Sequence, residues 1–209
     1  MEEDLYSSAA DGDAASLRRI LGGNPDLNVN WVNDGEHGWT ALHTASFNGH
    51  LAVVELLLSR PDIEVNQKSS GGHTAFLVAC GKGQADCARL LLNDPRVLVN
   101  EADDDGCTPL SEAALCDHVE IIQWLIASGR DLDLVDTGDE ETNAIEAARK
   151  QGKDEIVRLL ERFRDDEVQT RGEVRVELGL AGTLQSLLMI LWMSIPLLFL
   201  PCRGGGYHQ

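Results

Sequence analysis

The sequence predicts an all-α solenoid, a stack of helix-turn-helix units with projecting finger loops, from three repeated markers. Thr40, Thr74 and Thr108 stand 34 residues apart. A helix-ending residue recurs at a similar interval, as Gly12, Gly49, Gly83, Asp117 and Gly152. A third marker is the connecting segment, which reads NPDLNVN at 24–30, RPDIEVN at 60–66 and DPRVLVN at 94–100. A period in the thirties indicates stacked supersecondary units instead of one conventional core.

Each unit is expected to contain two short helices. The recurring Thr is placed to cap the first helix, and Pro109 is tolerated in its first turn. Gly49 or Gly83 ends this helix, because glycine adopts a left-handed conformation at little cost. The second helix carries apolar residues in pairs four apart, as in Val53, Val54, Leu57 and Leu58, and again in Ile121, Ile122, Leu125 and Ile126. One hairpin cannot bury this stripe alone, so each unit needs neighbours.

Residues 1–164 are expected to form the repeat domain, with units at about 3–30, 34–66, 68–100, 102–134 and 138–164. The first and last units differ from the others at their outer faces. Ser16 and Arg19 replace apolar residues in the first unit, and Glu161 replaces one in the last. Polar outer faces are what terminal repeats need for solubility.

Two of these segments, GWTALHTASFNGHLAVVELLL and GCTPLSEAALCDHVEIIQWLI, resemble ankyrin repeats. The signature of that family contains T-P-L-H-x-A, then a Gly-His pair, then a helix rich in Val and Leu. The resemblance covers about residues 1–164, although Asp117 replaces the helix-ending Gly and only one unit keeps the Pro. It implies that Thr40 and His43 form hydrogen bonds within a unit and to its neighbour. Thr40, His43 and Ser46 are therefore interpreted as structural, because a catalytic triad also needs an orienting acid and an oxyanion hole.

The sequence predicts no enzyme, cofactor or metal site. Its five cysteines form no C-x-x-C pair and no metal-like Cys/His spacing, which favours reduced thiols in an intracellular protein. The acidic start MEEDLYSSAA is no signal peptide, and no phosphate-binding motif is present. Calcium binding is disfavoured because the DDDG run at 103–106 lacks the spaced ligands of an EF-hand loop.

The chain is strongly acidic, with 35 acidic and 17 basic side chains and a net charge of −18. Residues 101–141 hold 13 of the acidic side chains and one basic residue, Arg130. The densest runs, EADDDG at 101–106 and DLDLVDTGDEE at 131–141, fall in expected finger loops. A negative surface repels the phosphate backbone of nucleic acids, which argues against a nucleic acid as the partner. The same charge favours a partner protein with a basic surface. The alternative is a solvated acidic surface that only aids solubility.

The resemblance also implies where a partner protein would bind, namely the finger tips and the exposed side of each first helix on the concave face. In this chain those positions are His37, Trp39, Phe47, Asn48, His73, Lys82, Asp104, Asp105, Cys107 and Leu115. Trp39 and Phe47 are the expected anchors, because exposed aromatic side chains are typical of interfaces. The alternative for Trp39 is that it only covers the neighbouring finger.

One modification is also implied by the resemblance. Asn66, in the run LLLSRPDIEVN, resembles an acceptor of asparaginyl hydroxylation. The alternative, a structural asparagine in a turn, is favoured.

The composition changes after the repeats. Residues 165–177 are expected to form a charged linker or to continue the last helix, 178–202 a hydrophobic segment without a charge, and 203–209 a short tail. As a helix, the 25 residues of the hydrophobic segment would span about 37 Å against a hydrocarbon core of about 30 Å. Pro196 and balanced flanking charges weaken this interpretation. The alternatives are a membrane anchor, an apolar cap on the repeats and an altered C-terminus.

Together these features predict a non-catalytic, monomeric, cytoplasmic scaffold that binds another protein. The alternative is a membrane-tethered adaptor held by residues 178–202.

Overall fold

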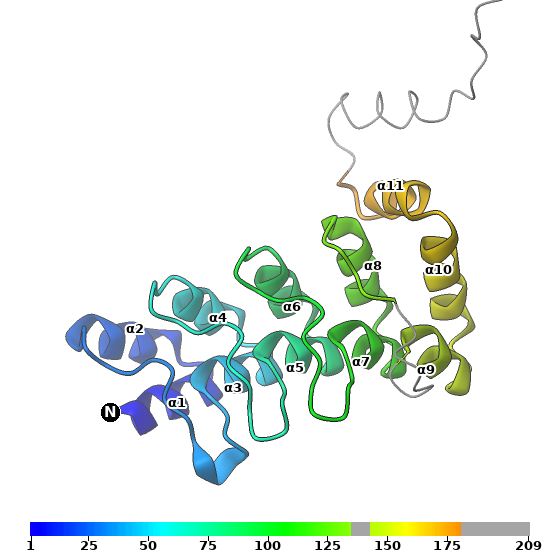
Figure 1. Cartoon of the computed structure of the whole chain (residues 1–209). Coiled ribbons are helices and arrows are strands. Elements are labelled where there is room, and N and C mark those ends of the chain that lie inside the picture. The colour runs from blue at the N-terminus through cyan, green and yellow to red at the C-terminus, as the bar shows by residue number, and fades with distance from the viewer. Residues whose placement is uncertain (135–142, 181–209) are drawn as a thin grey trace, which may run out of the picture.

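The computed structural model describes residues 1–134 and 143–180, and within them it confirms the all-α solenoid (Figure 1). The helices follow one another in pairs joined by tight turns. The pairs are α1 (Glu2–Ala10) with α2 (Ala14–Gly23), α3 (Ala41–Asn48) with α4 (Leu51–Leu58), α5 (Ala75–Gly81) with α6 (Ala85–Leu92), α7 (Pro109–Leu115) with α8 (Val119–Ser128), and α9 (Ala144–Lys150) with α10 (Asp154–Asp165). The described residues contain no β-strand, only an isolated bridge between Asn33 and Trp39.

The pairs stack so that each helix contacts its counterpart in the next pair. The helices α1, α3, α5, α7 and α9 form one row, and α2, α4, α6, α8 and α10 form the other. Between the rows lies one continuous hydrophobic core. Ala45, Ala79, Ala113 and Ala148 are completely buried in the first row. Their small side chains allow these helices to approach closely.

The recurring Thr residues cap the first helix of three pairs. The hydroxyl oxygens of Thr40, Thr74 and Thr108 accept hydrogen bonds from backbone N–H groups three residues later. Such caps satisfy donors that the first turn leaves without a partner. Asp117 stands where other units have glycine and keeps a left-handed backbone at φ 66°. Its carboxylate accepts a hydrogen bond from Lys153 Nζ at 2.8 Å, so this side chain also joins two pairs.

The second helices bury the predicted apolar stripes. Val53, Val54 and Leu57 are fully buried in α4, and Ile122 and Ile126 are fully buried in α8. Since the stripe faces the neighbouring helices, each pair is stabilised chiefly by the pairs beside it.

Residues 165–177 differ from the charged linker that the sequence predicts. They contain a further helix, α11 (Glu167–Glu177), which packs against α8 and α10 (Figure 1). Its inner face buries Thr170, Arg171 and Val174. The Arg171 guanidinium donates to the carbonyl oxygens of Ile126 at 2.7 Å and Arg130 at 2.6 Å. It thus satisfies acceptors at and just beyond the C-terminal end of α8, where a cation is favoured.

The predicted hydrophobic segment, 178–202, lies outside the described residues from 181 onward, as does the short tail at 203–209. Among the residues that are described, no helix has the length and apolar character needed to cross a membrane. The three alternatives for this segment therefore stay predictions.

Candidate functional site

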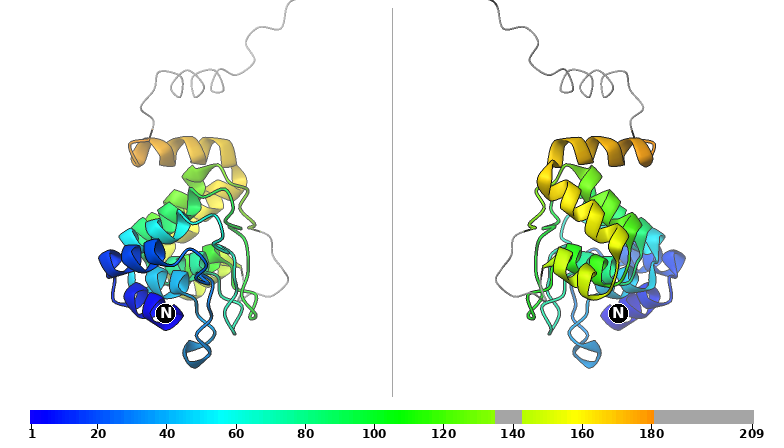
Figure 2. Two further views of the ribbon diagram at one scale, coloured as in Figure 1. Left: turned by 90° about the vertical axis from the view of Figure 1, so that its left-hand side faces the viewer. Right: turned by 90° about the vertical axis from the view of Figure 1, so that its right-hand side faces the viewer.

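The finger loops project to one side of the stacked helices (Figure 2). Three of them, at 33–39, 69–73 and 103–107, close in the same way. In each loop the first residue donates its backbone N–H to the carbonyl of the last, at 2.8, 2.9 and 3.0 Å. Adjacent loops are also bonded, from Ser70 N to His37 O at 2.9 Å and from Asp104 N to Gly71 O at 3.2 Å. These loops, with α3, α5 and α7, are called the finger face below.

Three asparagines hold the connecting segments together. Asn30, Asn66 and Asn100 each donate from the side-chain amide to a backbone carbonyl of the next unit, at 2.7, 2.8 and 3.0 Å. Each also accepts a backbone N–H of that unit through its side-chain oxygen, at 2.9, 2.9 and 3.2 Å. Asn66 therefore has the same partners as its two counterparts. This supports the structural role, and hydroxylation of Asn66 stays a prediction.

The His43 side chain joins two units. It is 1% exposed, and its Nδ1 lies 2.8 Å from the hydroxyl oxygen of Thr40. The other ring nitrogen, Nε2, donates to the backbone carbonyl of His73 at 2.9 Å. Burial lowers the pKa of His43 because the charged ring loses its hydration. Both nitrogens are thus engaged in the framework, and the buried Ser46 hydroxyl has no hydrogen-bond partner among the described residues.

An aromatic cluster lies on the finger face, formed by Trp39, Phe47 and Lys82. The rings of Trp39 and Phe47 lie 5.1 Å apart between centroids, and Lys82 Nζ lies 4.9 Å above the Phe47 ring. Both aromatic side chains are half-buried, and Lys82 is exposed. The Trp39 ring also stacks on His43, at 6.3 Å between centroids. The structure therefore brings together three predicted binding residues, from the finger loop at 33–39, from α3 and from the position just after α5.

The other predicted binding residues are placed as follows. His37, Asp104 and Asp105 are exposed in the finger loops, and Leu115 is 41% exposed at the end of α7. Asn48 is exposed but donates to the carbonyl of Ala10 at 3.2 Å, so its amide also has a framework role.

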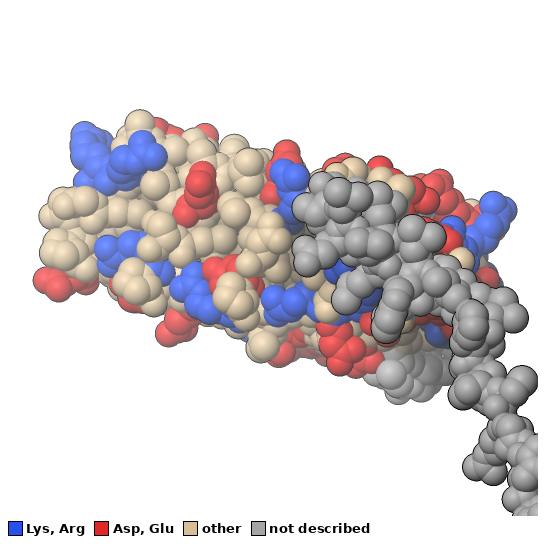
Figure 3. All heavy atoms as spheres, turned by 90° about the horizontal axis from the view of Figure 1, so that it is seen from above, with Lys and Arg blue, Asp and Glu red and all other residues tan. Residues whose placement is uncertain are grey.

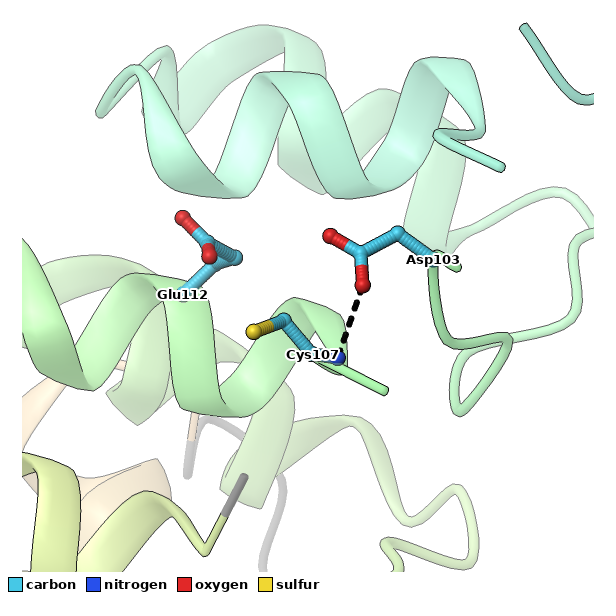
Figure 4. Close-up of side chains that lie close together, drawn as sticks. All are labelled: Asp103, Cys107 and Glu112. Atoms are coloured by element: carbon cyan, nitrogen blue, oxygen red, sulfur yellow. Dashed lines mark hydrogen bonds between the residues drawn. The ribbon is translucent and has the colours of Figure 1, made fainter. Parts of the chain in front are cut away.

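His73 and Cys107 belong to a second cluster, which extends from the finger loops to α7 (Figure 4). One donor atom from each of Asp103, Cys107 and Glu112 lies within 4.8 Å of the others. His73 Nε2 lies 3.6 Å from the Asp103 carboxylate, whose side chain is only 5% exposed. Burial, followed by the negative charges of Asp103 and Glu112, raises the pKa of the Cys107 thiol to about 11.

The sequence predicts Cys107 as a surface residue but does not indicate Asp103 or Glu112. Asp103 is hidden in a run of three aspartates, and Glu112 stands where other units have Thr44 and Val78. A comparison of units could have detected the charged residue at this helix position.

The distribution of charge differs between sides of the molecule. Figure 3 shows the side away from the finger tips, where Lys and Arg side chains are interspersed with Asp and Glu. On the finger face, Asp103, Asp104, Asp105 and Glu112 follow one another along one loop and the start of α7. In the described part of the chain, neither Asp103 nor Glu112 forms an ion pair with Lys or Arg.

Comparison with known protein families matches residues 63–136 to ankyrin repeats in three copies and residues 37–70 to an ankyrin repeat. One similar protein is the target of rapamycin complex 2 subunit AVO2 of Saccharomyces cerevisiae, 30% identical over 134 residues, which are 64% of this chain and 31% of the yeast protein. Another is the human SMC5-SMC6 complex localization factor protein 1, 37% identical over 92 residues, covering 44% of this chain and 9% of that protein.

A shorter match is to the human NAD-capped RNA hydrolase NUDT12, 44% identical over 57 residues, which are 27% of this chain and 12% of the hydrolase. The chain thus spans less than a third of the length of each of these relatives.

Proposed function

This chain belongs to the ankyrin repeat family, and from that premise we propose that it is a non-catalytic scaffold whose finger face binds a partner protein. The observation that carries the proposal is the cluster of Trp39, Phe47 and Lys82. These side chains leave aromatic surface and a cation accessible on the finger face. Aromatic side chains of this kind supply most of the binding free energy in many interfaces.

The acidic finger loop supports a partner with a basic surface. Asp104 and Asp105 are exposed at the tip of the loop next to the one that ends at His73. Opposite charge speeds association and selects partners more than it strengthens the bound state. We infer that the partner contacts the aromatic cluster with an apolar side chain and the acidic loop with Lys or Arg.

Two relatives support the scaffold class, since the names of both refer to protein complexes. The match to a hydrolase covers only 27% of this chain. The framework roles of His43 and Thr40 also argue against a catalytic use of the T-x-x-H motif.

The test is quantitative affinity capture with the full chain, followed by titration calorimetry with each captured partner. We expect Phe47→Ala to weaken binding at least about tenfold, as typical for an interface anchor. Leu51→Ala is the matched control, because Leu51 is 40% exposed on α4 and lies outside the finger face. Circular dichroism verifies that both variants fold. Equal binding by the Phe47 and Leu51 variants would contradict the proposal.

A further inference from the structure

The cluster of Asp103, Cys107 and Glu112 has a composition that the repeat architecture does not require. The equivalent positions one unit earlier are Ser69, His73 and Val78. Ser69 and Asp103 share one task, since each accepts a backbone N–H within its own finger loop. That task needs an oxygen acceptor but no charge. It therefore does not explain why the Cys107 thiol and the Glu112 carboxylate lie beside Asp103.

We propose that Asp103, Cys107 and Glu112 bind a divalent transition metal ion of the zinc type. The three donor atoms lie within 4.8 Å of one another, and Figure 4 shows the three side chains as neighbours in one cluster. Donors around tetrahedral zinc lie about 3.5 Å apart, given metal–ligand distances of about 2.0–2.3 Å. Bringing the three donor atoms from within 4.8 Å to about 3.5 Å of one another would complete the arrangement.

The Asp103 carboxylate is held in place before any ion binds. Its Oδ1 accepts from the backbone N–H of Cys107 at 2.8 Å and of Asp105 at 3.0 Å. Its Oδ2 faces His73 Nε2 at 3.6 Å, and the side chain is 95% buried. Hydrogen-bonded neighbours of this kind orient the ligands of a metal and strengthen binding.

The type of donor selects the ion. Calcium and magnesium prefer six or more oxygen ligands, whereas a thiolate with carboxylates suits zinc or cobalt. In the described part of the chain, no Lys or Arg neutralises the two carboxylates by an ion pair. A divalent cation would supply the positive charge that balances the two carboxylates. Since Cys107 and Glu112 are only half-buried, water could occupy the remaining coordination position.

The probe is cobalt(II), added to the reduced, chelator-free full chain and followed by absorption spectroscopy. Coordination by Cys107 gives a sulfur-to-cobalt charge-transfer band with a stoichiometry of one ion per chain, and added zinc removes the band. We expect Cys107→Ser to abolish the band and Glu112→Gln to weaken binding at least tenfold. Neither outcome depends on the partner protein.

The matched control is Cys116→Ser, because Cys116 is an exposed thiol next to the end of α7. Cys202→Ser is the second control, for the cysteine outside the described residues. Both variants should keep the band, and thermal unfolding without metal shows whether every variant folds. Absence of the band in the unaltered chain, or its survival in Cys107→Ser, would overturn the proposal and leave only adventitious binding.

Discussion

The side chain of His43 shows how much of this fold depends on single hydrogen-bonded residues. Its ring is buried, contacts Thr40 within its own unit and donates to the carbonyl of His73 in the next. The resemblance of the T-x-x-H motif to the ankyrin signature predicts both roles, although the equivalent residues of the next two units are Leu77 and Ser111. The partner of Nε2 is a backbone atom 30 residues away, which only the structure identifies.

A pH dependence follows from the burial of His43. The folded chain favours the neutral ring, so the pKa lies below its ordinary value of 6.5, while the unfolded chain takes up a proton near 6.5. The native protein should therefore lose stability relative to a His43→Gln variant as the pH falls below 6.5, and not above it. Urea unfolding of both proteins at about pH 7.5 and about pH 5.5 measures the difference.

His37→Gln serves as the control for that experiment, since His37 is exposed in its finger loop. A difference between the native protein and His43→Gln that stays constant with pH would contradict the prediction.

The turns between paired helices connect one pair to the next. His50, Gln84 and His118 follow the turn residue of their unit, and each donates a side-chain N–H to a carbonyl of the preceding pair, at 2.9, 2.9 and 3.2 Å. These contacts leave no room for a side chain at the turn they cover. A Cβ at Gly83 would lie 2.5 Å from the ring of His118, whereas one at Gly152 would have nothing within 4 Å.

Gly83→Ala should therefore destabilise the protein more than Gly152→Ala. Both positions have a left-handed backbone, with φ of +71° and +68°, so both variants lose about 1 kcal/mol from backbone strain. Only Gly83→Ala also displaces His118, which adds about 1 kcal/mol for its lost hydrogen bond. Chemical unfolding measures the free energy of unfolding of both variants. Equal losses in the two variants would show that His118 moves aside without a loss of stability.

The sequence allows residues 165–177 to continue the last helix, but it does not predict α11 as a separate helix that packs on α8. The α11 valines at 168 and 176 are 61% and 53% exposed, whereas the face that packs on α8 contains Thr170 and Arg171 beside Val174. A helix whose buried face is largely polar produces no apolar stripe, so the segment resembles a linker. The paired helices of the repeats have strong stripes, and the sequence predicts them well for that reason.

The contribution of α11 can be measured through Arg171. Arg171→Met keeps the apolar stem but leaves the carbonyls of Ile126 and Arg130 without this donor. We expect the free energy of unfolding to fall by about 2–3 kcal/mol, as for buried hydrogen bonds to a charged group. Arg164→Met is the control, because Arg164 is 54% exposed in an ion pair with Asp165 and should contribute less than about 1 kcal/mol. If both variants lost a similar amount of unfolding free energy, α11 would be only loosely attached to α8.

The whole molecule carries a net charge of −18, which opposes compact folding through self-repulsion. The sequence alone predicts that the net charge is negative and that acidic residues are concentrated between residues 101 and 141. It does not predict that Asp103 turns inward, with a side chain 5% exposed, while Asp104 and Asp105 stay exposed. That distinction arises from the hydrogen bonds that close the finger loop.

Raising the ionic strength to about 0.15 M should increase the melting temperature, because the screening length then falls to about 8 Å. Calorimetry in a sodium chloride series measures the increase. Asp104→Asn combined with Asp105→Asn should reduce it, since two exposed charges are removed. A melting temperature that falls with salt would show that attractive ion pairs outweigh the repulsion.

The asparagine contacts at 30, 66 and 100 make neighbouring units interchangeable. Each of these three connections uses the same pair of bonds, with the side chain on one unit and backbone atoms on the next. A duplicated copy of residues 67–100, one full period of 34 residues, would therefore offer a matching connector at both of its junctions. The length of the molecule is thus a variable that gene duplication can change in whole units, extending the finger face without redesign of any existing contact.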